Sequence, residues 1–592
     1  MLKRITWRDA LIAISFALFA LAFQLQRWSD SWSGIFINGD AALYTAVAAA
    51  RANPDLFIGD TLLEDPGNYN FYRPIHIPTI EALGWLTGDY GKGVVLLLGP
   101  LVWIHLLGYY LLGRVLYQNR FWALILSITT SVYILTPIGD DVGLMFDPLP
   151  GFAFGALLPY LLSAIIRFRD DTKKWPTIIG CCAGLIYVHP VSAPAWVFGL
   201  WLFYALSNPD GSLLRDRVRR ALALGLVACF VALPFAALYV SSHDHLPNDP
   251  VKVGAIKDAM EARIEPTLFS PGSTIGAFSK WLLTDFYYTY FALMSLCLLL
   301  SSSQTDRRNT TALITVVSGA VLFTVLLPCA EYVLTMGSEV PYETDLIRPL
   351  KYVVPVIFVL SIWGLCAVQE RLARSIKPEY FMTFVSVLVG LVFVFYVHMK
   401  DSHTAHFVYP TIQAWMHGNL LPEQPMTQLV HVEAIRAVRD FTPEKSKVFV
   451  ASAFALQVRY AALRPVVYAF KDGWFFTMSN YDALLKWYDT YKKLGKISKT
   501  GYSPTEVKQT LIPIAKELNA DYILVYFGAY FAGIKTHTGY GVKLTSTANL
   551  MTSSVSSNGS DPISNQGPHQ IDLDRLTPVW SNRQYGLYKL VK

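Results

Sequence analysis

The chain has 592 residues, of which 53% are hydrophobic and only 16% are charged, and its formal net charge is +6. Soluble globular proteins contain roughly 25% charged residues, so this composition excludes an ordinary soluble domain and indicates a polytopic membrane protein. The basic residues lie in short clusters between apolar segments, where membrane topology explains them. The lipid bilayer is therefore an expected partner, and no nucleic acid is expected.

Eleven segments are predicted to cross the membrane, because a hydrocarbon core about 30 Å thick requires about 20 apolar residues in a helix. The first, 11–25, follows three basic residues and precedes no small-residue cleavage site, so we interpret it as a retained anchor. The other predicted spans are 94–116, 121–136, 151–166, 177–188, 193–206, 221–240, 286–300, 312–327, 353–368 and 381–397. Several are short, so one or two could be re-entrant or fused.

Basic residues in alternate links predict the orientation of the chain. The clusters expected on the side of the N-terminus are Arg114 with Arg120, Arg167 to Lys174, Arg215 to Arg220, Arg307 with Arg308, and Arg371 to Lys377. Positively charged links lie on the cytoplasmic side, so the N-terminus is predicted to be cytoplasmic, in the plasma (inner) membrane. The predicted outer loops are 27–92, 137–150, 241–285 and 329–350, and the chain after residue 400 is also expected outside.

The predicted fold is mainly α, with a transmembrane domain of about eleven helices at 1–400 and an extracytoplasmic α/β domain at 401–592. The first outer loop carries two amphipathic stretches, 41–51 and 75–86, which we expect to form interfacial helices. Periodicity in the second domain predicts helices at 430–441, 481–494 and 505–518 and strands at 447–451, 465–470, 521–527 and 585–591. The Ser-, Thr-, Asn- and Gly-rich segment 537–570 is predicted to be a mobile loop.

Three aspartates on the predicted outer side are candidates for chemistry. Asp40 follows the first span, and Asp140 and Asp141 lie in the second outer loop. A carboxylate beside an acceptor hydroxyl can act as a general base, and grouped carboxylates can bind a divalent cation such as Mg²⁺ or Mn²⁺. The alternative interpretations are that Asp40 caps the helix after it and that Asp140 and Asp141 belong to a solvated loop.

Four basic or imidazole side chains are expected at the same face: Arg73, His189, Arg348 and Lys351. Arg348 and Lys351 are three residues apart at the outer end of a predicted span, so they share one face of a helix and could bind a phosphate. The alternative for this pair is contact with lipid headgroups. His189 precedes a proline at a helix junction and could equally be structural.

Several familiar catalytic motifs are missing from the sequence. It contains no Walker A loop, no GxGxxG after a strand, no HExxH and no GxSxG. Their absence disfavours nucleotide-driven transport, dinucleotide chemistry, zincin proteolysis and α/β-hydrolase chemistry. Energy for any reaction is therefore expected to come with the substrate.

Together these features resemble the C-type (GT-C) superfamily of membrane glycosyltransferases, which use polyprenyl-phosphate sugar donors. Gly39-Asp40 is similar to the first-loop acidic motif of that family, Asp140-Asp141 to the second, and Arg348 to a late-loop arginine that binds phosphate. The pieces 464–472 and 582–588 resemble outer domains of many uncharacterised members. The chain lacks the Trp-Trp-Asp signature of oligosaccharyltransferases, which argues against asparagine glycosylation.

The resemblance implies an inverting glycosyltransferase that moves a sugar from a polyprenyl-phosphate donor to an extracytoplasmic glycan, lipid or protein. Asp40 would be the catalytic base, and Arg348, Lys351, Arg73 and His189 would stabilise the departing lipid phosphate. Asp140 and Asp141 would bind the acceptor or, with Asp40, a metal ion. The alternatives are a lipid-linked glycan transporter or permease, a metal-independent polysaccharide polymerase or ligase, and a noncatalytic membrane subunit.

Overall fold

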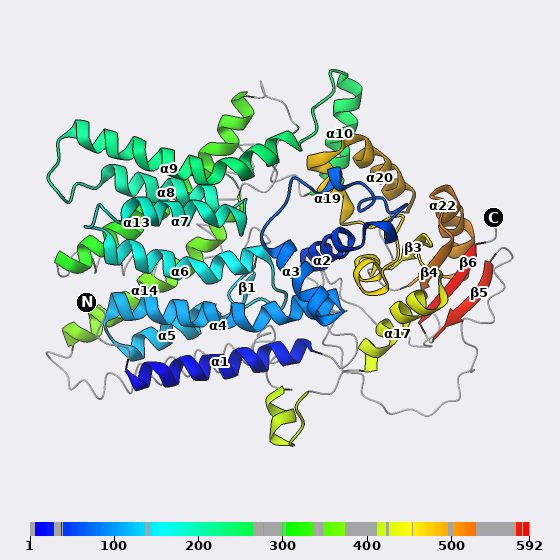
Figure 1. Ribbon diagram of the computed structural model, residues 1–592, viewed down its shortest axis with the longest axis horizontal. Helices are drawn as coiled ribbons and strands as arrows, with labels where there is room; N and C mark the ends of the chain where they lie inside the picture. Colours follow the sequence, from blue (N-terminus) through cyan, green and yellow to red (C-terminus); the bar gives the residue numbers. More distant parts are fainter. Residues whose placement is uncertain are drawn as a thin grey trace. The chain divides into compact units, whose positions relative to one another are not determined.

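The chain divides into two compact units in a computed structural model (Figure 1). Unit 1 comprises Met1–Gln26, Leu96–Leu238 and Glu265–Pro422, and unit 2 comprises Arg27–Val95, Tyr239–Ile264 and Glu423–Lys592. The structure describes residues 6–28, 37, 39–135, 141–264, 276, 296, 299, 304–334, 340, 347–372, 411–421, 426–452, 454–494, 501–528, 576–582 and 584–590. The contacts thus group the whole of the predicted first outer loop, 27–92, with the C-terminal part of the chain.

Six helices within the described ranges are long and apolar enough to cross a membrane. They are α1 (Trp7–Arg27), α4 (Tyr90–Tyr117), α6 (Pro150–Phe168), α9 (Leu214–Ser241), α13 (Gln304–Leu334) and α14 (Val353–Leu372), the last preceded by the 3₁₀ turn η5 (Arg348–Tyr352). Each coincides with a span predicted from the sequence. The chain is therefore mainly helical, with the apolar helices of a membrane-embedded protein.

The remaining five predicted spans do not appear as long apolar helices among the described residues. Helices α7 (Trp175–Gly184, continued by η3 at Leu185–Tyr187) and α8 (Ala193–Leu206) are apolar but short; at 1.5 Å per residue the 14 residues of α8 span about 21 Å. Helix α5 (Arg120–Ser131) ends earlier than predicted, because β1 (Ile134–Leu135) follows and pairs antiparallel with β2 (Asp141–Val142). The predicted spans 286–300, apart from residues 296 and 299, and 381–397 lie outside the described residues.

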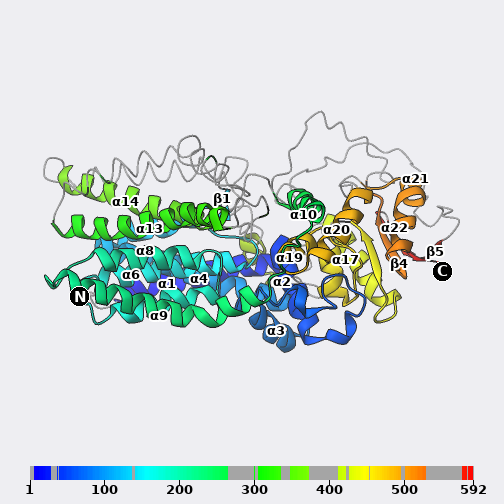
Figure 2. The ribbon, with the colours of Figure 1, turned by 90° about the horizontal axis from the view of Figure 1, so that it is seen from above.

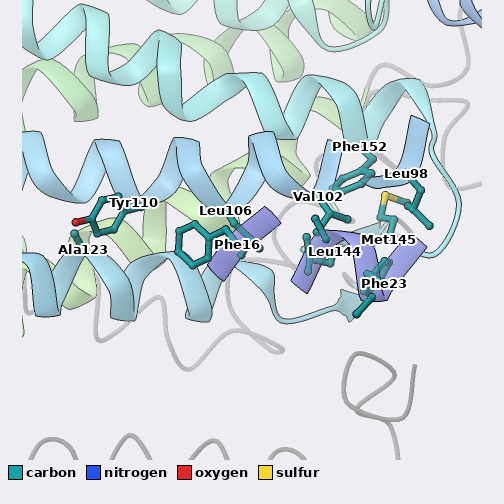
Figure 3. Packing of buried hydrophobic residues seen from close by; sticks show 12 residues of the cluster. Phe16, Phe23, Leu98, Val102, Leu106, Tyr110, Ala123, Leu144, Met145 and Phe152 are labelled. Atoms are coloured by element: carbon teal, nitrogen blue, oxygen red, sulfur yellow. The ribbon is translucent and has the colours of Figure 1, made fainter. Parts of the chain in front are cut away.

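Helix α1 packs along one face of α4 in the apolar core shown in Figure 3. Leu98, Val102 and Leu106 recur every four residues on α4, which places them on a single helix face. Phe16 and Phe23 of α1 fill the space against that face and are at most 7% exposed. The opposite side of α1 is apolar and exposed, as expected of a helix that contacts lipid; its exposed residues include Leu11, Ile14, Leu18 and Leu21.

Helices α8 and α13 lie side by side in both views (Figures 1 and 2) and meet through two glycines. A Cβ placed on Gly199 would lie 2.1 Å from the carbonyl oxygen of Val316, and one placed on Gly319 would lie 2.6 Å from Gly199 Cα. Neither position has room for a side chain. The two backbones therefore approach closely, as in small-residue contacts between membrane helices.

Ion pairs join links that the sequence predicts to lie on the N-terminal side. Asp9 near the start of α1 pairs with Arg114 at the end of α4 and, at 3.1 Å, with Arg120 at the start of α5. Asp170, after α6, pairs with Arg308 of α13 at 2.6 Å. Within each group, links far apart in the sequence therefore lie beside one another, as the alternating topology requires.

Unit 2 contains a four-stranded sheet in the order β3-β4-β6-β5, formed by β3 (Val448–Ala451), β4 (Tyr522–Tyr526), β5 (Leu576–Ser581) and β6 (Tyr585–Leu590). The parallel β3–β4 pair is joined through several helices, as a parallel crossover requires, and the other pairs are antiparallel. Asn582 Oδ1 accepts hydrogen bonds from the Gln584 and Tyr585 N–H groups and shapes the turn before β6. The α/β prediction for this region is confirmed.

The helices of unit 2 include both predicted helices of the first outer loop, α2 (Gly39–Ala52) and α3 (His76–Thr87). Short 3₁₀ turns, η1 (Pro54–Leu56) and η2 (Pro66–Asn68), lie between them. The others are α10 (Pro250–Arg263), α17 (Met426–Phe441), α18 (Ala455–Gln457) with the π turn η6 (Val458–Ala462), α19 (Asp472–Ser479), α20 (Tyr481–Leu494), and α21 (Pro504–Glu506) continued by the π turn η7 (Val507–Leu511) and α22 (Ile512–Glu517). The predicted loop 537–570 lies outside the described residues.

The prediction of a strand at 465–470 is wrong. Only an isolated parallel bridge joins Val466 to Val448. Pro465 has no N–H group, and the Val466 N–H donates to a carboxylate oxygen of Asp60 at 2.8 Å instead of to a neighbouring strand. Two backbone hydrogen bonds join the segment to Val448, but they form no continued ladder, and the Asp60 carboxylate takes the Val466 N–H group.

The partly buried imidazole of His431 in α17 predicts a loss of stability in acid. Its Nδ1 lies 2.8 Å from the Tyr585 hydroxyl, and burial lowers the pKa of His431 to about 4 from 6.5. The unfolded chain therefore binds this proton more readily, and stability falls as the pH drops from 6.5 to 4, by at most about 3 kcal/mol. We expect His431→Phe to lose less thermal stability than wild type between pH 7 and pH 4.5; equal losses would contradict this assignment.

Candidate functional site

Asp40 lies in the first turn of α2, in unit 2. The helix begins at Gly39, whose φ of +59° is a left-handed conformation that favours glycine. Because α2 begins before Asp40, the carboxylate lies inside the first turn rather than at the cap position. In the first turn the positive end of the helix dipole favours its negative charge. Residues 41–50 are all buried, so the helix that carries Asp40 is firmly packed.

Lys471 is a partner of Asp40, although 431 residues separate them in the sequence. Its Nζ donates to Asp40 Oδ1 at 2.8 Å, and both side chains are about one-third exposed. A second contact, from Gln457 Nε2 to the Ile37 carbonyl oxygen at 2.8 Å, holds the chain just before α2. An ion pair this exposed adds little stability, so its main effect is to orient the carboxylate.

A buried charged triad holds Lys471 in place. Asp472, the next residue, and Asp60 of the predicted first outer loop both pair with the fully buried guanidinium of Arg459. Arg459 Nε and Nη2 donate to Asp60 at 2.8 and 2.9 Å, and Nη1 and Nη2 donate to Asp472 at 2.5 and 2.7 Å. Burial raises the pKa of Asp472, and Arg459 opposes that shift. The backbone that presents Lys471 is therefore anchored by two bidentate pairs.

The second candidate site lies in unit 1, around Gly151 at the start of α6. A Cβ placed on Gly151 would lie 3.1 Å from Lys351 Nζ, 3.3 Å from Tyr352 Oη and 3.5 Å from His189 Nε2. Tyr352 Oη donates to the Gly151 carbonyl oxygen at 2.7 Å. The three polar groups therefore converge where Gly151 has no side chain; we call Arg348, Lys351, Tyr352 and His189 the cationic cluster.

The 3₁₀ geometry of η5 places Arg348 and Lys351 on one side. With three residues per turn, positions i and i+3 eclipse each other, so the predicted shared face is confirmed, although the element is a 3₁₀ turn rather than an α-helix. Lys351 is only 5% exposed. The buried ammonium and the neighbouring guanidinium both act on His189, whose pKa their charges lower.

His189 contributes a neutral ring to the cluster. It lies between η3 and α8, and burial lowers the pKa of His189 well below its ordinary value, as do the charges of Lys351 and Arg348. At neutral pH the imidazole therefore carries one N–H, and it can bind an anion only by donating that hydrogen. Its Nδ1 is buried without a hydrogen-bond partner.

Among the other predicted site residues, Arg73 is the one whose side chain the structure describes. Arg73 belongs to unit 2, where its exposed guanidinium donates to the Asn70 side chain. Asp140 lies outside the described residues, and Asp141 is described only as a backbone position of β2. Across the ranges given above, no group of three or more His, Cys, Asp or Glu side chains could hold a metal ion.

Sequence reasoning assigned no role to Lys471, Gly151 or Tyr352. Lys471 stands in a segment that carries the family resemblance, but nothing local links it to Asp40. Comparison with known proteins adds no relative: no family model matches the chain, and no curated protein matches it. The function is therefore argued from the two sites.

Proposed function

We propose that this chain is an inverting membrane glycosyltransferase that moves a sugar from a polyprenyl-phosphate donor to an acceptor hydroxyl. The observation that carries the proposal is the convergence of Lys351, Tyr352 and His189 around Gly151 within an apolar helical unit. A lipid phosphate is a suitable ligand for such a site, because its hydrocarbon chain can contact the apolar helices and its phosphate can bind the cationic side chains. The anchored carboxylate of Asp40 supplies the second group that the reaction requires.

The proposed reaction balances with these groups alone. Asp40 takes the proton from the acceptor hydroxyl as its oxygen bonds to the anomeric carbon. The bond from that carbon to the phosphate oxygen breaks, and the electron pair leaves with the lipid phosphate. Arg348 and Lys351 stabilise the growing negative charge, and the neutral His189 donates one hydrogen bond. Attack opposite the leaving group inverts the anomeric carbon.

The number of membrane spans and their orientation are also part of this proposal. We propose eleven spans, made of the six long helices, the shorter α5, α7 and α8, and the segments 286–300 and 381–397. The N-terminus would be cytoplasmic and Asp40 extracytoplasmic, in the plasma (inner) membrane. The six long apolar helices and the ion pairs between predicted N-side links support this arrangement.

A divalent cation has no step in the mechanism. The Asp40 carboxylate already faces the Lys471 ammonium at 2.8 Å, an arrangement that does not suit a metal ligand set. Asp140 and Asp141 could still bind a cation or the acceptor. Transfer measured with and without a chelator decides whether Mg²⁺ or Mn²⁺ contributes.

Lys351→Met tests the phosphate assignment. A hydrogen bond to a charged group contributes about 1.5–3 kcal/mol, so affinity for undecaprenyl phosphate should fall about 10- to 100-fold. The matched control is Lys173→Met, which removes an exposed lysine from the link after α6. The affinities for undecaprenyl phosphate are measured on the purified chain in lipid nanodiscs. If wild type and Lys351→Met bound it equally well, Lys351 would not be part of the phosphate site.

The cationic cluster also favours one alternative. A metal-independent polymerase or ligase would use arginine, lysine and histidine around a lipid phosphate without an aspartate base. Sugar transfer that survives Asp40→Asn but fails in Lys351→Met would favour that class over the proposed mechanism.

A further inference from the structure

A cleft in unit 1 extends the cationic cluster toward α4. Its volume is about 20 Å³, enough for one hydroxyl group or one water molecule. His105 and Tyr109 of α4 line it on one side, Gly151 and Gly155 of α6 on another, and Tyr352 joins it to the cluster. Gly151 and Gly155 are four residues apart, so the face of α6 that borders the cleft carries no side chains at these positions.

Two buried polar atoms on the α4 side have no hydrogen-bond partner. They are His105 Nδ1 and the Tyr109 hydroxyl oxygen, on side chains that are 3% and 0% exposed. The rings lie together, with centroids 4.8 Å apart. Leaving a buried polar group unsatisfied costs about 1–3 kcal/mol, so two such groups side by side at a cleft point to a ligand.

The hydrogen bond that His105 makes within the protein determines which hydrogen-bonding groups the ligand must have. His105 Nε2 lies 3.0 Å from the Thr130 carbonyl oxygen, which can only accept, so Nε2 carries the hydrogen. In the neutral form of the ring Nδ1 is then an acceptor, while the Tyr109 hydroxyl can donate. A hydroxyl group suits either atom, because it can both donate and accept a hydrogen bond. A phosphate or carboxylate has no hydrogen to donate, and an ammonium accepts none.

The geometry points to a site for a sugar hydroxyl of the lipid-linked donor, at His105 and Tyr109. The inference rests on the proposed function, which puts the donor phosphate at the cationic cluster. Tyr352 belongs to both the cluster and the cleft, and Gly151, around which the cluster converges, lines the cleft. A phosphate at Lys351 and a hydroxyl at Tyr109 can therefore belong to one molecule. The site thus distinguishes polyprenyl phosphate that carries a sugar from polyprenyl phosphate alone.

The test compares Tyr109→Phe with Tyr160→Phe in the full-length chain in nanodiscs. Tyr160 is the matched control, because its hydroxyl donates to the Ile104 carbonyl oxygen at 3.0 Å and it does not line the cleft. The probes are undecaprenyl phosphate with and without a single glucose, mannose or arabinose. We expect Tyr109→Phe to weaken binding of the preferred sugar lipid about three- to tenfold and to leave binding of the bare lipid unchanged.

Other outcomes overturn the inference in distinguishable ways. An unchanged sugar preference in Tyr109→Phe means that a water molecule, not a sugar hydroxyl, satisfies the two atoms. If Tyr109→Phe weakens binding of both lipids equally, Tyr109 contributes to folding or to phosphate binding rather than to sugar binding. If wild type binds none of these lipids, the proposed function and this inference fail together. Gly155→Ala, which adds a methyl group at the cleft wall 3.3 Å from the Tyr352 ring, should reproduce the selective loss if Tyr109→Phe folds poorly.

Discussion

Replacing Asp40 by Asn should slow sugar transfer by about 10²- to 10⁴-fold, the typical contribution of a general base. The amide keeps the size of the side chain and still accepts a hydrogen bond from Lys471, but it cannot take the acceptor proton. Binding of the lipid donor should change little, because the proposed phosphate site is formed by Arg348 and Lys351 rather than by Asp40. The loss should therefore appear in kcat rather than in donor affinity.

Two controls separate catalysis from folding in this experiment. Asp55→Asn removes an exposed carboxylate from the same outer loop and should leave transfer unchanged. The double variant Asp40→Lys with Lys471→Asp restores an ion pair of reversed polarity, and with it the local structure. We expect it to remain inactive; recovery of transfer by this swap would show that Asp40 has only a structural role.

Replacing Arg459 by Met should destabilise unit 2 by about 3–5 kcal/mol, because it leaves Asp60 and Asp472 buried without their countercharge. The same change releases the segment that presents Lys471, so sugar transfer should fall as well. Thermal unfolding and limited proteolysis of the purified chain would measure the first effect, with cleavage expected within unit 2.

Comparison variants make this second prediction specific. Arg51→Met removes an ion pair with Glu81 in which both side chains are about one-third exposed, and it should cost less than about 1 kcal/mol. Adding Asp60→Asn and Asp472→Asn to Arg459→Met removes the uncompensated charges and should recover part of the stability. If Arg459→Met were as stable as Arg51→Met, the triad would not anchor this region.

Much of the fold can be predicted from periodicity. Helix α20 follows its predicted bounds because Tyr481, Leu484 and Trp487 repeat on one buried face. Strands β4 and β6 were likewise expected from their apolar composition. Strand β5 was missed because Pro578 disfavours a strand; it is tolerated there because β5 is an edge strand with an irregular register next to that proline.

The candidate sites were predictable only in part. Asp40, Arg348 and Lys351 stand in short motifs whose residue types suggest their chemistry. Lys471 could not be paired with Asp40, because the contact depends on how two distant segments pack in unit 2. His105 and Tyr109 lie inside an apolar helix, and only the packing of α4 against α6 and η5 shows that they border a cleft.

The most direct test of the proposed function is release of polyprenyl phosphate from a panel of polyprenyl-phosphate sugars by the purified chain in nanodiscs. We predict that wild type consumes at least one donor and that Asp40→Asn consumes it about 10²- to 10⁴-fold more slowly. A well-folded wild-type chain that consumed no donor, or an Asp40→Asn variant that worked at the wild-type rate, would contradict the proposal.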